Sequence, residues 1–495
     1  MTPDPRVAFQ TKTHPEAMSA VISPPFQRYA AIIPDPEGFE ASLRRPLDRF
    51  VWTNPLKTIP DRLRPLLAEA GFGPVPLPWD PSAFRITGGS QGLGSHWGYF
   101  AGFYQIQEAS SMVPVQLLDA RPGMRILDLC AAPGNKTAQA AAFMNNRGTL
   151  IANDAIGGRL SAVRFTTARL GILNVSVTCH DGVNFPKRAG SFDRVMVDAP
   201  CSCEGISRKN PRVLKRSRLD RKGFARRQLL LLEQGIRRCR PGGRILYSTC
   251  TYAPEENEAV VDAALRRRSG EIRVLPASLA GLRTSPGLIR WDGVSFHPDL
   301  AHTLRIWPHL NDTGGFYLAL LERLGSPEDV GNQSGASIGT TQDTSHRRLE
   351  PNRRDAYTRL LNDRFGIPSS TFENLQWLEK GTRHVFVAAS DHDPKEMPCE
   401  MNGFPLLHVR PATPRLTSEA ATLFGGLATR NRVDLTAEQF TRYMQRRDVD
   451  LEATQIESVT GSGIVLVGAF GTVIGNGYCR VADRRLVSYF PKKWM

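Results

Sequence analysis

Apolar stretches of strand length alternate with helix-length stretches through the middle of the chain. The apolar stretches predict strands, and the amphipathic stretches between them predict helices. Alternation of this kind gives an α/β fold, a mostly parallel sheet with helices on both faces. The predicted strands are 124–129, 149–153, 174–179, 192–198 and 243–249, and the predicted helices are 136–144, 159–170, 221–239 and 255–267. Two later runs, 305–309 and 315–321, predict a closing antiparallel pair.

The chain before this alternating part divides into two regions. Residues 1–25 are rich in Pro and Thr, and we expect them to be flexible. Residues 26–105 predict a small subdomain with helices at 36–50 and 60–70.

The chain after the alternating part also divides into two. Residues 325–350 are rich in Gly, Ser and Thr and poor in apolar residues, which predicts a linker. Residues 351–495 predict a second globular region. Its segment 461–477 consists of β-branched residues interrupted by Gly, a pattern typical of short strands joined by tight turns.

The first predicted strand leads into a tight turn and then an Ala-rich helix. Residues 130–134 are small and include a Pro-Gly pair, so the backbone turns sharply there. In α/β sheets, nucleotide-like ligands bind where a strand, a turn with exposed backbone and a helix follow one another. The phosphate-loop pattern is excluded because Asn135 stands where its second Gly should be, and the pattern G-x-G-x-x-G is absent.

Acidic residues end three successive predicted strands: Asp128, Asp154 and Asp181. Carboxylates at the carboxyl ends of parallel strands suit a ligand with ribose hydroxyls, an adenine amine and a positive centre. S-adenosylmethionine has all three features and no phosphate. The alternative is that each Asp only caps the helix that follows it.

Composition narrows the class of protein. The net charge is +15 with a pI near 9.7, which favours a nucleic-acid partner over simple solubility. The eight cysteines follow no disulfide spacing, and Cys-x-x-Cys never occurs, so we expect reduced thiols in a cytoplasmic protein and no metal site. The first residues contain Asp4 and no apolar core, and no apolar run has the length of a membrane span.

Three motifs together resemble one family. They are Asp128-Leu-Cys-Ala-Ala-Pro-Gly-Asn-Lys-Thr137, Asp198-Ala-Pro-Cys201-Ser and Ser248-Thr-Cys250. In this order they resemble the RNA cytosine-C5 methyltransferases, the Nop2/NSUN/Sun family. The resemblance implies a Rossmann-like class I methyltransferase domain over 106–324 and an RNA-facing subdomain over 26–105. The basic, aromatic end of the chain is similar to the PUA-like RNA-binding tail of RsmF-type 16S rRNA methyltransferases.

The chemistry of such an enzyme explains two of the cysteines. Carbon 5 of cytosine is a poor nucleophile until a thiolate adds at carbon 6, so the reaction needs a cysteine, a proton donor and a base. Cys201 and Cys250 follow the fourth and fifth predicted strands, which should be neighbours, although spacing does not decide which one attacks. The resemblance implies that Cys250 is the nucleophile, that Cys201 releases the product and that Asp198 contacts the cytosine edge. For both cysteines the alternative is a packing role.

The resemblance also implies where the cofactor binds. Lys136 is expected to help hold the acids or the base. The residues expected to bind S-adenosylmethionine are Cys130, Ala131, Ala132, Pro133, Gly134, Asn135, Lys136, Asp154, Asp181 and Asp198. Cys203 departs from the family pattern, which has Gly there, and adds a third thiol beside Cys201.

Basic residues are concentrated between the two reacting cysteines. We predict a phosphate clamp made of Arg208, Lys209, Arg212, Lys215 and Arg216, and the alternative is a solvated helix face. Arg49, Asn54 and Lys57 could also contact phosphate or form an ordinary solvated face, and Trp52 occupies the family's Arg position there.

Together these patterns predict a monomeric enzyme acting on structured RNA and not on a membrane. The target base has to be splayed out of its stack, or lie in a loop, to react. The C-terminal resemblance favours 16S rRNA as the substrate, with tRNA as the nearest alternative. A non-catalytic ribosome-assembly factor is a third possibility, and the presence of both cysteines and all the acids argues against it.

Overall fold

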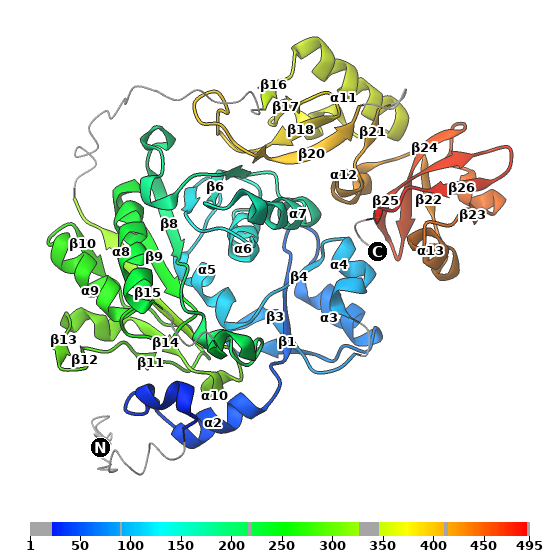
Figure 1. The fold of residues 1–495 in the computed structure, drawn as a ribbon. Helices are drawn as coiled ribbons and strands as arrows, with labels where there is room; N and C mark the ends of the chain where they lie inside the picture. Colours follow the sequence, from blue (N-terminus) through cyan, green and yellow to red (C-terminus); the bar gives the residue numbers. More distant parts are fainter. Residues whose placement is uncertain (1–21, 90–91, 216–219, 326–345, 410–413, 493–495) are drawn as a thin grey trace, which may run out of the picture.

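A sheet of ten strands forms the centre of the molecule (Figure 1). The computed structural model describes residues 22–89, 92–215, 220–325, 346–409 and 414–492. Most of the predicted flexible N-terminus, 1–21, and most of the predicted linker, 326–345, lie outside these described residues. The strand order of the central sheet is β11-β14-β15-β9-β8-β5-β6-β7-β19, with β11 at Ser285–Pro286, and β10 (Ile272–Val274) pairs with β15.

The strands at the middle of this sheet are parallel, as predicted. They are β5 (Arg125–Asp128), β6 (Thr149–Asn153), β7 (Val175–Thr178), β8 (Phe192–Asp198) and β9 (Cys239–Thr249). The predicted closing pair is also confirmed, because β14 (Leu304–Ile306) and β15 (Phe316–Arg323) run antiparallel. The alternating pattern therefore predicted both the number and the direction of these strands.

Helices cover both faces of the sheet because successive strand residues point to opposite faces. Ile126 of β5 packs into a core with the helices α5 (Val113–Leu118), α6 (Asn135–Phe143) and α7 (Leu160–Leu170). The next residue, Leu127, packs into a second core with α8 (Arg221–Arg238) and α9 (Glu258–Arg267). The sheet is thus buried on both sides, as its uninterrupted apolar strands require.

The N-terminal subdomain contains a sheet that the sequence did not predict. Its antiparallel strands are β1 (Arg49–Thr53), β2 (Pro74–Leu77), β3 (Asp80–Ile86) and β4 (Tyr104–Ile106), in the order β2-β3-β1-β4. The predicted helix 36–50 was therefore wrong in its second half, since α2 spans Pro36–Arg44. Arg45 precedes a proline and is extended, which ends the helix. Helix α3 spans Pro60–Glu69, as predicted within one residue.

The C-terminal region holds two sheets of five strands each (Figure 1). The first contains β16 (Arg347–Arg348), β17 (Gln376–Lys380), β18 (His384–Ala388), β20 (Phe404–His408) and β21 (Arg415–Leu416), beside the helices α11 (Pro351–Phe365) and α12 (Ser418–Phe424). The second contains β22 (Arg432–Asp434), β23 (Val449–Asp450), β24 (Gly463–Ala469), β25 (Thr472–Arg480) and β26 (Arg485–Ser488), beside α13 (Ala437–Met444). The strands predicted within 461–477 are confirmed, and a PUA-like fold for this region stays a prediction.

The C-terminal region is joined to the central domain through the sheet itself. Strand β19 (Met401–Asn402) pairs antiparallel with β7 and so adds an edge strand to the central sheet. Near the second C-terminal sheet, the rings of Trp97 and Phe470 stack with centroids 4.9 Å apart. The predicted linker 325–350 also ends earlier than expected, because β16 already pairs with β17. In the described parts of the chain, no helix combines the length and apolar character that crossing a bilayer requires.

Candidate active site

A cavity of about 890 Å³ lies where β5, β8 and β9 end. The turn after β5 lines one side of it, the two cysteine motifs line another, and residues 46–50 of the N-terminal subdomain close a third. The carboxyl ends of parallel strands meet at one edge of a sheet, which is where such folds bind ligands. The chain therefore builds this cavity from several segments that are distant in sequence.

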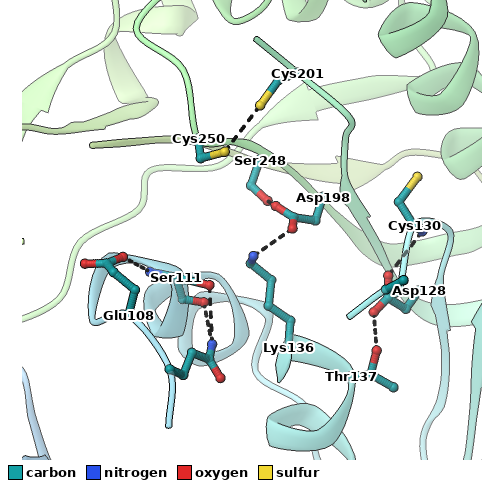
Figure 2. A network of polar contacts seen from close by, with 12 residues as sticks. Glu108, Ser111, Asp128, Cys130, Lys136, Thr137, Asp198, Cys201, Ser248 and Cys250 are labelled. Atoms are coloured by element: carbon teal, nitrogen blue, oxygen red, sulfur yellow. Dashed lines mark hydrogen bonds and ion pairs between the residues drawn. The ribbon is translucent and has the colours of Figure 1, made fainter. Parts of the chain in front are cut away.

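The two predicted reacting cysteines meet at this cavity (Figure 2). The Sγ atoms of Cys201 and Cys250 lie 3.4 Å apart. Strands β8 and β9 pair in parallel with Asp198 opposite Ser248, which brings the two loops after them together. Both side chains line the cavity, with Cys201 buried and Cys250 partly buried. The prediction that these two strands are neighbours is confirmed.

Asp198 is held from two sides (Figure 2). Lys136 Nζ donates to Oδ2 at 2.7 Å, and Ser248 Oγ donates to Oδ1 at 2.8 Å. The Lys136 ammonium also lies over the ring of Phe316, 5.0 Å from its centroid, a cation–π contact. These contacts fix one carboxylate at the cavity wall beside the thiols.

The surroundings of both thiols disfavour the thiolate in the free protein. Hydrogen bonds with Cys203 and Cys250, together with burial, hold the pKa of Cys201 well above its ordinary value. The hydrogen bond with Cys201 lowers the pKa of Cys250, but contact with Cys203, burial and the charge of Asp198 outweigh it and leave that pKa raised as well. Both thiols therefore carry their protons at neutral pH, and the reacting thiolate has to form when substrate binds.

The turn before α6 is built for close approach. Gly134 has φ +103°, and a Cβ there would lie 2.9 Å from the Cα of Val163, so only glycine fits without a shift. Asp154 contacts this turn, since it accepts from the amide of Ala132 at 3.2 Å and pairs with Arg159 at 3.2 Å. The turn thus stands with its backbone facing the cavity, and a strand-end carboxylate fixes its shape.

The other two strand-end acids have different surroundings. Asp128 is buried and accepts from Thr137 Oγ1 at 2.7 Å and from the amide of Cys130 at 3.3 Å, so its carboxyl braces the turn from inside. Burial raises the pKa of Asp128 to about 7. Asp181 caps the short helix that follows it and pairs with Arg227 at 2.9 Å. Helix capping, the alternative considered for each Asp, therefore applies to Asp181, whereas Asp128 braces the turn.

The predicted phosphate clamp has to be corrected at Arg208. Its side chain is 1% exposed, pairs with Asp312 at 2.8 Å and donates to the carbonyls of Pro46 and Thr313. These bonds tie three segments together and leave the guanidinium inside the protein. Lys209 and Arg212 are exposed, as a clamp requires, whereas the side chain of Lys215 and all of Arg216 lie outside the described residues.

Asn54 and Lys57 are also not phosphate contacts. The Asn54 amide is buried and donates to the carbonyls of Gly102 and Leu170. Lys57 Nζ donates to the carbonyls of Ala101 and Arg169, and burial lowers its pKa to about 7. Both expectations, phosphate contact and a solvated face, were wrong here, because these side chains join the N-terminal subdomain to α7. Arg49 does line the cavity and donates to the carbonyl of Gly88.

Sequence reasoning missed Glu108 as a cavity residue. The sequence patterns predicted no site residue within residues 103–112. The Glu108 carboxylate instead lines the cavity and accepts from the amides of Gly314 at 2.8 Å and Ser111 at 3.1 Å (Figure 2). The available signal was that Glu108 is the one charged residue in the segment 103–112.

Comparison with known proteins identifies the family. Residues 115–322 match the family model described as 16S rRNA methyltransferase RsmB/F. A tRNA (cytosine(49)-C(5))-methyltransferase of Pyrococcus abyssi is 37% identical over 60% of this chain and 94% of its own. The chain belongs to the RsmB/F family of RNA cytosine-C5 methyltransferases. The crystal structure of a methyltransferase homologue from Pyrococcus horikoshii agrees in fold, with a TM-score of 0.54 and 31% identity over 61% of this chain and 93% of that one.

Relatives within this family differ in how much of the chain they share. Ribosomal RNA small subunit methyltransferase F of Erwinia tasmaniensis is 28% identical over 88% of this chain and 92% of its own. The match to the mouse 28S rRNA (cytosine-C(5))-methyltransferase is 38% identical but spans only 37% of that protein's length. The methyltransferase domain is therefore the part that the RsmB/F family shares most widely, and the C-terminal region has a counterpart in the Erwinia protein.

The cofactor of the RsmB/F family is S-adenosylmethionine, and the residues present fit it. The turn before α6 lines the cavity with the small residues Cys130, Ala132 and Pro133, and the Asp198 carboxylate at the same cavity complements a sulfonium charge. The cavity lining joins this turn to the two cysteines, so a methyl donor and a nucleophile can share it.

Proposed function

We propose that the protein methylates carbon 5 of a cytosine in rRNA, with Cys250 adding to carbon 6 of the base. The observation that supports this most is the 3.4 Å separation of the Cys201 and Cys250 sulfurs at one cavity wall. Two thiols this close can act in succession on adjacent carbons of one ring. S-adenosylmethionine would bind along the turn 130–136 and supply a methyl group activated by its positive sulfur.

The proposed reaction begins with the thiol of Cys250. Its proton passes to the Asp198 carboxylate and its sulfur bonds to carbon 6, which places negative charge on the ring. Asp198 lies beside the thiols and receives a hydrogen bond from the Lys136 ammonium, so this pair can contact the ring nitrogen edge and supply a proton to it. Ser248 keeps the carboxylate from turning away. Carbon 5 then has the electron density that methyl transfer requires.

Product release falls to Cys201 in this proposal. After transfer, carbon 5 carries both the new methyl group and its original proton. Cys201, whose own thiol proton has passed to solvent, takes that proton as a thiolate, the ring double bond re-forms and the bond between Cys250 and carbon 6 breaks. Cys250 leaves as a thiolate and regains a proton from the ring nitrogen through Asp198, so both cysteines are thiols again and one proton has been released to solvent.

A covalent trapping experiment tests these roles. Cys201→Ala should accumulate an RNA adduct on Cys250, visible as a slow band in a denaturing gel. The double variant with Cys250→Ala should show no adduct, and Cys179→Ser, at an exposed thiol, should behave as the unchanged protein does. An adduct that persists without Cys250 contradicts the assignment.

The choice of rRNA rests on similarity across the whole chain. The Erwinia relative named as a small-subunit rRNA enzyme aligns with 88% of the chain, C-terminal region included. The second candidate substrate is tRNA, favoured by the 37% identity to the Pyrococcus abyssi enzyme over the methyltransferase part. Bisulfite sequencing of rRNA and tRNA from a deletion strain distinguishes the two, because only the true substrate loses a methylated cytosine.

A further inference from the structure

Three thiols, rather than two, meet at the active-site cavity. The Sγ atom of Cys203 lies 3.9 Å from that of Cys201, which lies 3.4 Å from that of Cys250. All three sulfurs lie within 4.8 Å of one another, and all three residues line the cavity. The proposed reaction uses Cys201 and Cys250 only, so the third thiol has no role in it.

The spacing of the sulfurs matches that of a metal bound by three cysteines. Zinc binds thiolate sulfur at about 2.3 Å, so sulfurs around one ion lie roughly 3.8–4.0 Å apart in tetrahedral or trigonal geometry. The separations here are 3.4 and 3.9 Å, with the third no more than 4.8 Å. Small side-chain rotations would therefore bring the three sulfurs onto one ion.

The backbone at Cys203 is unfavourable for any residue with a side chain. Cys203 has φ +63° and ψ +24°, the left-handed conformation that glycine adopts freely. Other residues adopt it at a cost of about 1 kcal/mol or more. The Cys203 side chain nevertheless lies beside the other two sulfurs, and its Sγ donates a hydrogen bond to the carbonyl of Cys201 at 3.2 Å. The conformation and the thiol together suggest a ligand at this position.

We propose that Cys201, Cys203 and Cys250 bind a thiophilic metal ion, zinc, through their three sulfurs. Bound zinc blocks methylation reversibly. On binding, the three thiols release three protons to solvent and three sulfur–zinc bonds form, with no change in oxidation state. The fourth coordination position faces the cavity and is open to water. Bound zinc occupies both reacting sulfurs, so RNA cannot add to Cys250 until the metal leaves. The block on methylation rests on the proposed function, whereas metal binding does not.

Metal titration tests the site without any RNA. Cobalt(II) is added to the full-length protein under a non-thiol reductant and followed by its thiolate charge-transfer band in the near ultraviolet. We expect one equivalent of cobalt to give the band and zinc to displace it. Cys203→Gly removes a ligand, so it should weaken binding by more than the roughly tenfold that loss of an outer-shell partner of a metal ligand costs. Cys203→Ser, which keeps the size of the side chain but not its soft sulfur, should weaken metal binding to a similar extent. Cys179→Ser should bind the metal as the unchanged protein does.

Each outcome decides the proposal. No thiolate band, or equal affinity in the unchanged protein and both Cys203 variants, overturns the site. If the band forms as expected, zinc should inhibit methylation of RNA by the unchanged protein, and Cys203→Gly should resist at the same zinc concentration. Binding without inhibition overturns the regulatory part. Absence of methylation in metal-free protein contradicts the proposed function instead, and the cobalt titration still decides the site.

Discussion

The ammonium of Lys136, which follows the turn at 130–134, lies 2.7 Å from the carboxylate of Asp198, which precedes Cys201. The Lys136 side chain is 11% exposed and that of Asp198 is 30% exposed. This ion pair joins the helix after β5 to the end of β8, so it holds the two halves of the cavity in register. It also places the Lys136 ammonium beside a carboxylate that lines the cavity.

Neutralising Asp198 should remove most of the activity and little of the stability. Asp198→Asn keeps the shape but loses the charge that Lys136 pairs with, and the methyl-transfer rate should fall about 10²–10⁴-fold, as for loss of an acid–base group. Single-turnover methylation measures this. Ser248→Ala, which removes only the second hydrogen bond to the carboxylate, is the matched control and should lose much less. An Asn variant with normal rates would contradict the assigned contact.

Lys209 should contribute to RNA binding through charge alone. It is exposed at the cavity rim, so Lys209→Glu should weaken affinity for RNA and lower the salt dependence by about one phosphate contact. Binding measured at several salt concentrations gives the slope. Lys187→Glu, the same charge change at an exposed residue outside the cavity lining, serves as the control for net charge. An unchanged slope in Lys209→Glu would remove this residue from the interface.

Its neighbour Arg208 should behave in the opposite way. Arg208→Ala breaks a buried ion pair and leaves two carbonyls without a donor, so the free energy of unfolding should drop by about 2 kcal/mol or more. Urea unfolding followed by circular dichroism measures the loss. Lys209→Ala should change stability by less than about 0.5 kcal/mol. Equal stability of the two variants would show that the Arg208 bonds contribute nothing.

Replacing Cys203 by glycine should stabilise the metal-free protein. Glycine adopts the left-handed conformation of this position without strain, which predicts a gain of about 1 kcal/mol. Thermal unfolding in the presence of a chelator measures it. Cys203→Ala, which retains the strain, separates the backbone effect from loss of the sulfur. A lower melting temperature for Cys203→Gly than for Cys203→Ala would contradict this prediction.

The buried carboxyl of Asp128 should make stability fall with rising pH. Its pKa is about 7 in the folded protein, because of burial, against 3.8 ordinarily. Between these values the folded protein holds a proton that the unfolded chain has lost, so raising the pH through this window lowers the free energy of unfolding by at most about 1.4 kcal/mol per pH unit.

The comparison with Asp128→Asn isolates this effect, because asparagine does not titrate. The difference in unfolding free energy between the two proteins, measured by urea at pH 4.5, 5.5 and 6.5, should shift steadily in favour of the variant. A difference that is constant across this range would mean that Asp128 is ionised throughout.

The local sequence pattern alone determined the fold of the central domain and the order of its functional motifs along the chain. Short apolar runs between amphipathic helices specify parallel strands. The turn at 130–134 can be recognised from the sequence because small residues and a Pro-Gly pair are typical of tight turns. Cys201 and Cys250 were assigned to adjoining strand ends from strand order, and the coordinates agree. Such inferences succeed because they depend only on neighbours in sequence and on how parallel strands join.

Only the tertiary structure decided what depends on distant partners. The burial of Arg208 requires Asp312 and two backbone carbonyls from other segments, and a basic residue in a basic stretch gives no sign of them. The strand at 49–53 forms because β3 and β4 pair with it. The cluster of three thiols arises because β9 returns Cys250 beside Cys201 after 49 residues, which no Cys-x-x-Cys spacing could signal. Charge and propensity are properties of the residue, whereas burial and distance belong to the fold.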